Sequence, residues 1–208
     1  MAKFINKKSC YIEKTVKLGK TVVIYPNVVI EGTTFIDEGT VIYNGCYIRD
    51  SIIGKNNMIY SSHIFKSKIG NDNLIGPYTH IRENSLISDQ TRIGSFVELK
   101  KTMVGNKSKI PHLSYVGDAK IGNNVNIGCG VITANYDGEN KHKTIINDNA
   151  FIGCNSNLVA PVEIGKDTFI AAGTTVTKNV GDNEFAISRV KQENKKNKKV
   201  VKKWKRYY

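Results

Sequence analysis

The sequence has little proline, almost no tryptophan and no long apolar run. Of its 208 residues, four are Pro and one is Trp. No stretch approaches the roughly 20 consecutive apolar residues that a membrane-spanning helix needs, which argues against an integral membrane protein. Residues 1–9 are rich in Lys but lack the apolar centre of a secretory signal peptide. We therefore expect a cytoplasmic protein without a membrane span.

Cysteine is also scarce. The four cysteines lie far apart in the sequence and form no CxxC pair; they are Cys10, Cys46, Cys129 and Cys154. This spacing argues against a zinc knuckle and against a disulfide framework. Reduced thiols fit the cytoplasmic expectation.

Acidic residues are outnumbered by basic ones, and the imbalance is greatest at the C-terminal end. The chain holds 31 Lys and Arg against 18 Asp and Glu, a net charge of +13. Nine of the basic residues but only one Glu fall in residues 190–208. Such a tail is typical of a solvated end, and it also suits contact with the phosphates of a bound cofactor. No nucleic-acid-binding module accompanies it, so we expect no nucleic acid partner.

An aliphatic residue recurs at every sixth position in three long runs. These runs are Leu18, Ile24, Ile30, Ile36, Ile42 and Ile48; Ile69, Ile75, Ile81, Ile87, Ile93 and Leu99; and Ile146, Ile152, Leu158, Ile164, Ile170 and Val176. Neither an α-helix nor a simple strand has this period. A six-residue period is typical of a parallel β-helix, in which each short strand turns one aliphatic side chain inward. We therefore predict an all-β solenoid.

The repeat also predicts the organisation of the chain. We expect a lead-in over residues 1–14, the β-helix domain over 15–189 with about eight coils, and the basic tail over 190–208. The period pauses between Thr133 and Ile146, a gap of thirteen residues instead of six. The extra residues predict one inserted loop at about 134–144, since they are polar and contain Asp-Gly. Insertions in solenoids often form the binding face.

The densest polar segment, 111–130, leads directly into this loop. From 112 to 180 the chain contains HLSYVGDAKIG, NVNIG, ITANYDG, LVAPVEIGK and IAAGTTVTK, and upstream it contains IGPYTHIRENSLI and SFVELKK. Together these motifs resemble one family over nearly the whole chain. It is the acetyltransferase half of the bifunctional bacterial enzyme that makes UDP-N-acetylglucosamine, within the hexapeptide-repeat acyltransferases.

The resemblance implies a left-handed parallel β-helix and a homotrimer with active sites between subunits. It further implies transfer of acetyl from acetyl-CoA to the amine of glucosamine-1-phosphate, giving N-acetylglucosamine-1-phosphate. The family's other half is a nucleotidyltransferase with a Gly-rich loop, and the chain contains no GxGxxG or P-loop. We therefore predict no UMP transfer by this chain, which leaves that step to a separate uridyltransferase partner.

The resemblance also implies roles for single residues. His112 matches the general base. The residues that match the sugar phosphate site are Arg82, Lys100, Tyr115, Asn126 and Lys141, of which the last reaches a neighbouring site. The residues that match the acetyl-CoA site are Cys129, Asn135, Tyr136, Cys154, Ala172 and Arg189.

Elementary chemistry supports these residue types. An amine attacks a thioester only when neutral, and histidine is a suitable base at neutral pH. Arginine offers a fixed, bidentate charge to a phosphate. The backbone N–H groups of Gly128, Cys129 and Gly130 would suit the oxyanion of the tetrahedral intermediate. The acetyl transfer needs no metal, and none is predicted.

The chain departs from the family pattern at three positions. Pro111 replaces the usual glycine before the base, and proline fixes φ and removes an N–H. Cys154 replaces the usual serine, and Cys129 stands where a small residue is common. We expect both cysteines to pack as small side chains and not to act as nucleophiles, because direct transfer needs no acyl-enzyme.

Three alternatives stay open at this point. The acceptor could be another amino sugar or a nucleotide-linked sugar, with the same base and cofactor. The chain could instead be a non-catalytic trimeric scaffold, which would not bind acetyl-CoA. A metal enzyme of the carbonic anhydrase type needs three histidines meeting at a subunit seam. The spacing of His63, His80, His112 and His142 does not indicate the close pair expected there.

Overall fold

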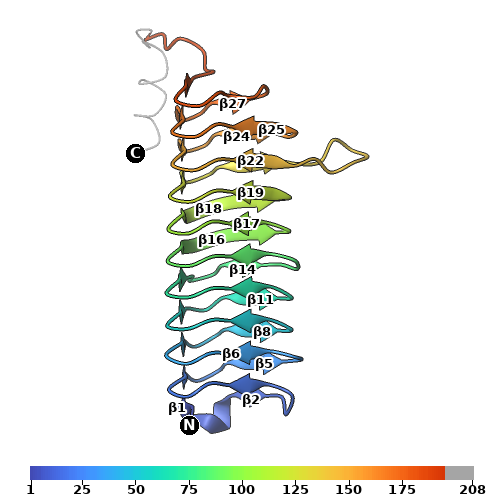
Figure 1. Cartoon of the computed structure of the whole chain (residues 1–208), viewed down its shortest axis with the longest axis vertical. Helices are drawn as coiled ribbons and strands as arrows, with labels where there is room; N and C mark the ends of the chain where they lie inside the picture. The colour runs from blue at the N-terminus through green and yellow to red at the C-terminus, as the bar shows by residue number, and fades with distance from the viewer. Residues whose placement is uncertain (195–208) are drawn as a thin grey trace, which may run out of the picture.

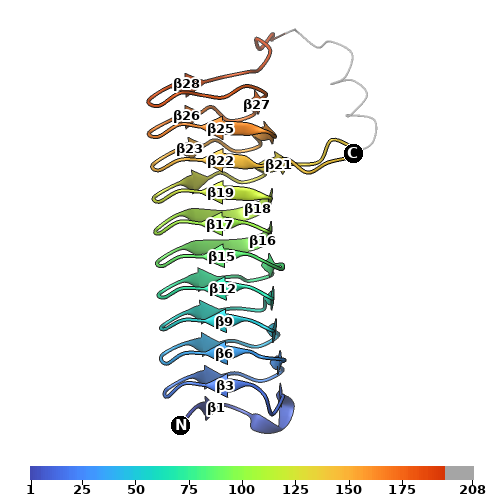
Figure 2. The same cartoon turned by 45° about the vertical axis from the view of Figure 1, so that its right-hand side comes forward.

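The chain folds into a left-handed parallel β-helix, as the six-residue period predicts (Figure 1). The computed structural model describes residues 1–194, so the predicted basic tail lies outside the described residues from 195 onwards. Strands from successive coils pair in parallel and stack into three flat faces along one axis (Figures 1 and 2). Among the described residues, no helix is long and apolar enough to cross a membrane.

The first face contains one short strand from each coil. Its strands are β1 (Lys3–Phe4), β4 (Val23–Ile24), β7 (Val41–Ile42), β10 (Met58–Ile59), β13 (Leu74–Ile75), β20 (Asn126–Ile127), β23 (Phe151–Ile152), β26 (Phe169–Ile170) and β28 (Phe185–Ala186). A short 3₁₀ helix, Lys7–Ser9, follows β1.

The second face follows the first around one corner of the prism. Its strands are β2 (Tyr11–Ile12), β5 (Val29–Glu31), β8 (Tyr47–Arg49), β11 (His63–Phe65), β14 (His80–Ile81), β21 (Ile132–Ala134), β24 (Asn157–Val159) and β27 (Thr175–Val176). Two long strands, β16 (Arg92–Lys100) and β18 (Lys109–Gly117), run across the first face, the corner and the second face.

The third face closes the prism. Its nine strands are β3 (Lys17–Leu18), β6 (Phe35–Ile36), β9 (Ile52–Ile53), β12 (Lys68–Ile69), β15 (Leu86–Ile87), β17 (Met103–Val104), β19 (Ala119–Ile121), β22 (Thr144–Ile146) and β25 (Val162–Ile164). Each strand represents one coil, so the chain has more coils than the eight expected. The estimate was low for two reasons. It counted only residues 18–176, although β1, β2 and β28 also stack, and some coils are shorter than eighteen residues: the partner of Met58 is Leu74, sixteen residues on.

The periodic aliphatics form the core. Ile24, Ile93 and Ile170 on the first face, for example, are fully buried, as are Ile30 on the second face and Ile36 on the third. One aliphatic per strand suffices because a β-branched side chain fills the narrow interior and suits an extended backbone. The expected lead-in already belongs to this stack, since β1 pairs with β4 and β2 with β5.

The predicted inserted loop projects from the stack between β21 and β22 (Figures 1 and 2). Thr133, just before it, keeps the period by pointing inward, where it is 1% exposed. Its hydroxyl accepts a hydrogen bond from the Gly117 N–H at 2.8 Å and donates to the Gly117 carbonyl at 3.1 Å. The coil therefore reaches Thr133 intact before the chain leaves it.

Candidate active site

A column of residues along one corner joins the predicted base to the predicted cofactor residues. β16 and β18 place Ser95 opposite His112. In each following coil, the strand before this corner and the strand after it pair with the coil below at the same offset in residue number. The corner residues are therefore stacked partners as well, which continues the column through Cys129, Cys154 and Ala172. We call these five residues the His112 column.

The column forms an open track. Neighbouring parallel strands lie about 4.8 Å apart, so three coil steps take the track about 14 Å from His112 to Ala172. His112, Cys154 and Ala172 are exposed, and Cys129 is half-buried. At the upper end, the Nη1 atom of Arg189 donates a hydrogen bond to the Ala172 carbonyl at 3.2 Å. The track therefore runs from an imidazole to a guanidinium.

Close backbone packing fixes the start of the column. A Cβ added to Gly94 would lie 2.6 Å from the carbonyl carbon of Pro111, so only glycine allows this approach. Pro111, which departs from the family pattern, lies within the continuous strand β18, and His112 stays in register with Ser95. Beside His112 the first face has a hollow of about 290 Å³ that Tyr60 and the two residues Pro111 and His112 help to line.

The expected oxyanion donors are only partly free. The Gly128 N–H donates to the Ile152 carbonyl at 2.8 Å, and the Gly130 N–H donates to the Leu113 carbonyl, also at 2.8 Å. The expectation is wrong for these two glycines because the stacking of coils already uses their N–H groups. Within residues 1–194, the Cys129 N–H has no backbone acceptor.

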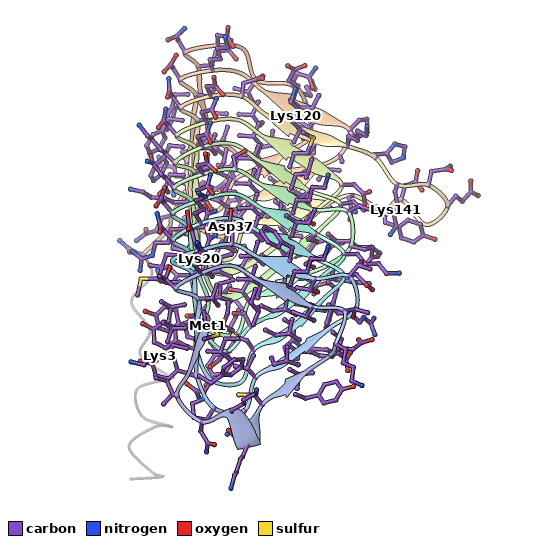
Figure 3. The ribbon with its side chains drawn as sticks, turned by 60° about the horizontal axis from the view of Figure 1, so that its bottom comes forward. Met1, Lys3, Lys20, Asp37, Lys120 and Lys141 are labelled. Carbon is purple, nitrogen blue, oxygen red and sulfur yellow. The ribbon has the colours of Figure 1, made fainter. Side chains whose placement is uncertain are left out.

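Three cations gather on the second face, around the corner of the prism from His112. Arg82 follows β14, Lys100 ends β16, and Lys141 comes from the inserted loop (Figure 3). Arg82 donates from Nη1 to Oε1 of Glu98 at 2.9 Å. This hydrogen bond raises the pKa of Arg82 and fixes the direction of its guanidinium.

The two lysines of this cluster repel each other. The nearby ammonium group of Lys141 lowers the pKa of Lys100, and Arg82 adds to that effect. Like charges held this close are unfavourable unless an anion joins them. The arrangement is therefore suited to a multiply charged anion such as a phosphate monoester.

Tyr115 and Asn135 pack together beside the cations. Gly117 provides the space, since an added Cβ there would lie 2.8 Å from Cζ of Tyr115 and 3.0 Å from Nδ2 of Asn135. Asn135 is 6% exposed, and its Nδ2 donates to Oδ2 of Asp118 at 2.6 Å. The hydrogen bond to Asp118 thus holds the Asn135 side chain in place before any ligand arrives.

Asp137 orders the inserted loop that carries Lys141. Its Oδ1 accepts the backbone N–H groups of Glu139 at 2.8 Å and Asn140 at 2.7 Å, and its Oδ2 lies 2.6 Å from Nε2 of His142. These interactions, the Asn140 N–H first, hold the pKa of Asp137 well below its usual 3.8. An isolated antiparallel bridge between Tyr136 and Lys141 completes the loop.

Not all of the predicted residues come together within one chain. Asn126 lies in β20 on the first face, on the other side of the corner from Tyr115. Tyr136 is 60% exposed at the base of the loop, and its hydroxyl donates to the Gly138 carbonyl. One cavity of a single chain therefore cannot contain the whole predicted set.

The histidines are arranged differently from the expectation. His63 and His80 occupy neighbouring coils of the second face, with ring centroids 6.2 Å apart. The spacing was misjudged because seventeen residues amount to one coil. Burial lowers the pKa of His80. Across residues 1–194, no group of three or more His, Cys, Asp or Glu side chains has an arrangement that could hold a metal ion.

The sequence interpretation missed the residues that support the site. Glu98 orients Arg82, Asp137 orders the loop, and Gly117 makes room for Tyr115. The spacing of sixteen residues between Arg82 and Glu98, about one coil, was a usable signal for the first of these. The Asp-Gly turn was a signal for the second.

The family model for the bacterial transferase hexapeptide, described as six repeats, matches residues 143–178. Over 191 residues the chain is 52% identical to the bifunctional protein GlmU of Listeria monocytogenes serotype 4a, covering 92% of this chain and 42% of that protein. It is 55% identical over 150 residues to GlmU of a Geobacillus strain, covering 72% of this chain and 33% of the relative. The chain thus spans less than half the length of these relatives.

Solved structures support the fold. The UDP-N-acetylglucosamine acyltransferase of Arabidopsis superposes with a TM-score of 0.65 at 16% identity, covering 86% of this chain and 69% of that one. The corresponding enzyme of Francisella novicida gives 0.57 at 22% identity, covering 86% and 62%. The chain therefore has a hexapeptide-repeat fold and is similar, over nearly all of its own length, to a part of the bifunctional GlmU proteins.

Proposed function

We propose that the chain is an acetyl-CoA-dependent N-acetyltransferase that converts glucosamine-1-phosphate to N-acetylglucosamine-1-phosphate. The observation that carries the proposal is the cation cluster of Arg82, Lys100 and Lys141, which lies around one corner from His112. The similarity to GlmU over 92% of the chain supports the same reaction.

The cluster is the site for the sugar phosphate. The positive charges of Lys100 and Lys141 repel each other, so an anion that binds both ammonium groups stabilises the pair. Arg82 adds a guanidinium whose direction is fixed by Glu98. The phenol of Tyr115 supplies a neutral group beside the charges. A sugar phosphate combines one dianionic end with several hydroxyls, which suits this mixture.

The His112 column is the site for acetyl-CoA. The cofactor's thioester would lie at His112, with its extended arm along Cys129 and Cys154 to Ala172. Its phosphates would meet the guanidinium of Arg189. The column is about 14 Å long, with an imidazole at one end and a guanidinium at the other. Both features support this orientation of the cofactor.

The chemistry follows from these positions. His112 takes a proton from the amine of the sugar as the nitrogen attacks the thioester carbonyl carbon. The carbonyl oxygen becomes an oxyanion, and the free Cys129 N–H is the donor available to it. When the intermediate collapses, the carbon–sulfur bond breaks and the leaving thiolate takes the proton from His112. The products are an amide and coenzyme A, with no acyl-enzyme and no metal required.

Assembly completes the site in this proposal. The predicted residues occupy two faces that flank one corner, with Asn126 on the first face and Lys100 on the second. A homotrimer would place the first face of one copy opposite the second face of the next. Active sites between subunits would then unite both groups.

The test is acetyl-CoA turnover, followed as release of free thiol, with glucosamine-1-phosphate as acceptor. Wild type and His112→Ala are compared, with His63→Ala as the matched control because His63 is exposed several coils away. We expect turnover in wild type and control and its loss in His112→Ala. Binding of acetyl-CoA without turnover would indicate a different amine acceptor. Absence of both would refute the enzyme and leave a scaffold.

A further inference from the structure

Cys129 and Cys154 stand side by side at the corner of two neighbouring coils. β20 pairs with β23 before the corner and β21 with β24 after it, in the same register. The Asn155 N–H donates to the Cys129 carbonyl at 2.8 Å, as expected where the cysteines are direct partners. Two thiols that are 25 residues apart in the sequence thus occupy one place on the surface.

The spacing suits a covalent bridge. Both cysteines lie in turns at stacked corners. The parallel strands that flank these corners lie about 4.8 Å apart, and disulfides span Cα distances of about 4.4 to 6.8 Å. Glycines flank both positions, Gly128 and Gly130 around Cys129 and Gly153 before Cys154. These glycines have no side chain that could cover the thiols.

The other two cysteines differ from this pair. Cys46 is 1% exposed, and burial raises the pKa of its thiol to about 11, which leaves it largely unreactive. Cys10 lies near the N-terminal end, where its Sγ donates to the Tyr25 carbonyl at 3.2 Å. Cys129 is half-buried and Cys154 is exposed, so both are open to reagents in solution.

We infer that Cys129 and Cys154 form a dithiol modification site that reacts with low-molecular-weight disulfides, such as glutathione disulfide, and closes to an intramolecular disulfide. The thiolate of Cys154 attacks one sulfur of the small disulfide, forming a mixed disulfide and releasing one small thiolate. The thiolate of Cys129 then attacks the Cys154 sulfur and releases the second. Two protein thiols are oxidised, one small disulfide is reduced to two thiols, and the protons pass to the released thiolates.

The site has a consequence for the cofactor, and this part rests on the proposed function. The pair lies in the middle of the His112 column, between the imidazole and the guanidinium of Arg189. A mixed disulfide there fills the track, and a bridge ties together two successive positions along it. The reduced chain therefore binds acetyl-CoA and the oxidised chain does not.

The test uses the full chain and glutathione disulfide, with intact mass and peptide mapping as the readout. In wild type we expect the loss of two hydrogens, mapped to Cys129 and Cys154, with no glutathione retained. Cys129→Ala should retain one glutathione on Cys154, because the resolving thiol is gone. Cys10→Ser is the matched control and should close the bridge as wild type does. Stable adducts on wild type, or no reaction while circular dichroism shows folded protein, would overturn the site.

Acetyl-CoA binding by calorimetry, before and after oxidation, tests the consequence. We expect binding to be lost on oxidation and restored by dithiothreitol. If the bridged protein binds as the reduced protein does, the block is overturned although the dithiol chemistry stands. If the reduced protein does not bind acetyl-CoA, the proposed function fails, whereas the mapped disulfide is unaffected.

Discussion

Replacing Gly117 by alanine should damage the site and leave the coil intact. The Tyr115 ring lies directly over Gly117, and an added Cβ would be 2.8 Å from Cζ of that ring. Carbon atoms in good contact are about 3.5 to 4.0 Å apart, so the ring must move by about 1 Å. Asn135, whose Nδ2 would be 3.0 Å from the new carbon, must move with it.

The expected effect on catalysis is large. A misplacement of about 1 Å costs on the order of 100-fold in rate, so kcat/KM for Gly117→Ala should fall by about that factor. The free energy of unfolding should change by less than about 1 kcal/mol, because alanine at an unstrained glycine position limits the unfolded chain and offsets some of the crowding. Gly117 belongs to strand β18 and has no positive φ, so the backbone itself tolerates alanine.

The assay is kcat/KM for thiol release from acetyl-CoA, with urea unfolding as the check on the fold. The double variant Tyr115→Ala, Gly117→Ala tests whether the loss of activity is caused by displacement of the Tyr115 ring. If the methyl group acts by displacing the Tyr115 ring, the double variant is no slower than Tyr115→Ala alone. Full activity in Gly117→Ala, or effects that simply multiply in the double variant, would refute the reasoning.

Three further predictions concern the cations, the loop and the core. Lys141→Gln should raise KM for glucosamine-1-phosphate, and it should raise the pKa of Lys100 in an NMR titration because the main repelling charge is gone. Asp137→Asn should speed hydrogen exchange in the loop at neutral pH. In wild type, loop order should persist well below pH 3.8 and be lost only as the pH falls through the lowered pKa of Asp137. Ile93→Ala should lower the free energy of unfolding in urea by about 3 kcal/mol, since the fully buried side chain leaves a cavity.

The sequence was sufficient to predict the fold because the interior accepts one aliphatic per strand. Every coil requires an aliphatic residue at the same inward positions, so the six-residue period can be recognised without knowing which strands pair. The number of coils was not readable. A corner can shorten by a residue without disturbing the inward positions, as two corners do between Met58 and Leu74. The misjudged spacing of His63 and His80 has the same cause.

The candidate site was predictable as a set of residues but not as an arrangement. The motifs predicted His112 and Lys141 as site residues. No sequence pattern predicts that Lys141 lies against Lys100 of its own chain. That contact depends on how the loop folds back, which Asp137 decides through hydrogen bonds to backbone N–H groups. Nor could a pattern show that coil stacking uses the N–H of Gly128.

The corner beside His112 breaks a local rule of the coil. At the position that follows the His112 column, the other coils place Asn or Gly, which tolerate a left-handed backbone, or the small residue Ser61. Here Tyr78, Phe96 and Leu113 occupy it, with φ of 60°, 60° and 32° and with 62%, 62% and 59% of each residue exposed. Large apolar side chains that are exposed to solvent do not stabilise the isolated chain. Local conflicts of this kind concentrate at functional sites. The proposed trimer explains the conflict, because the second copy that completes the site around His112 would cover this apolar ridge.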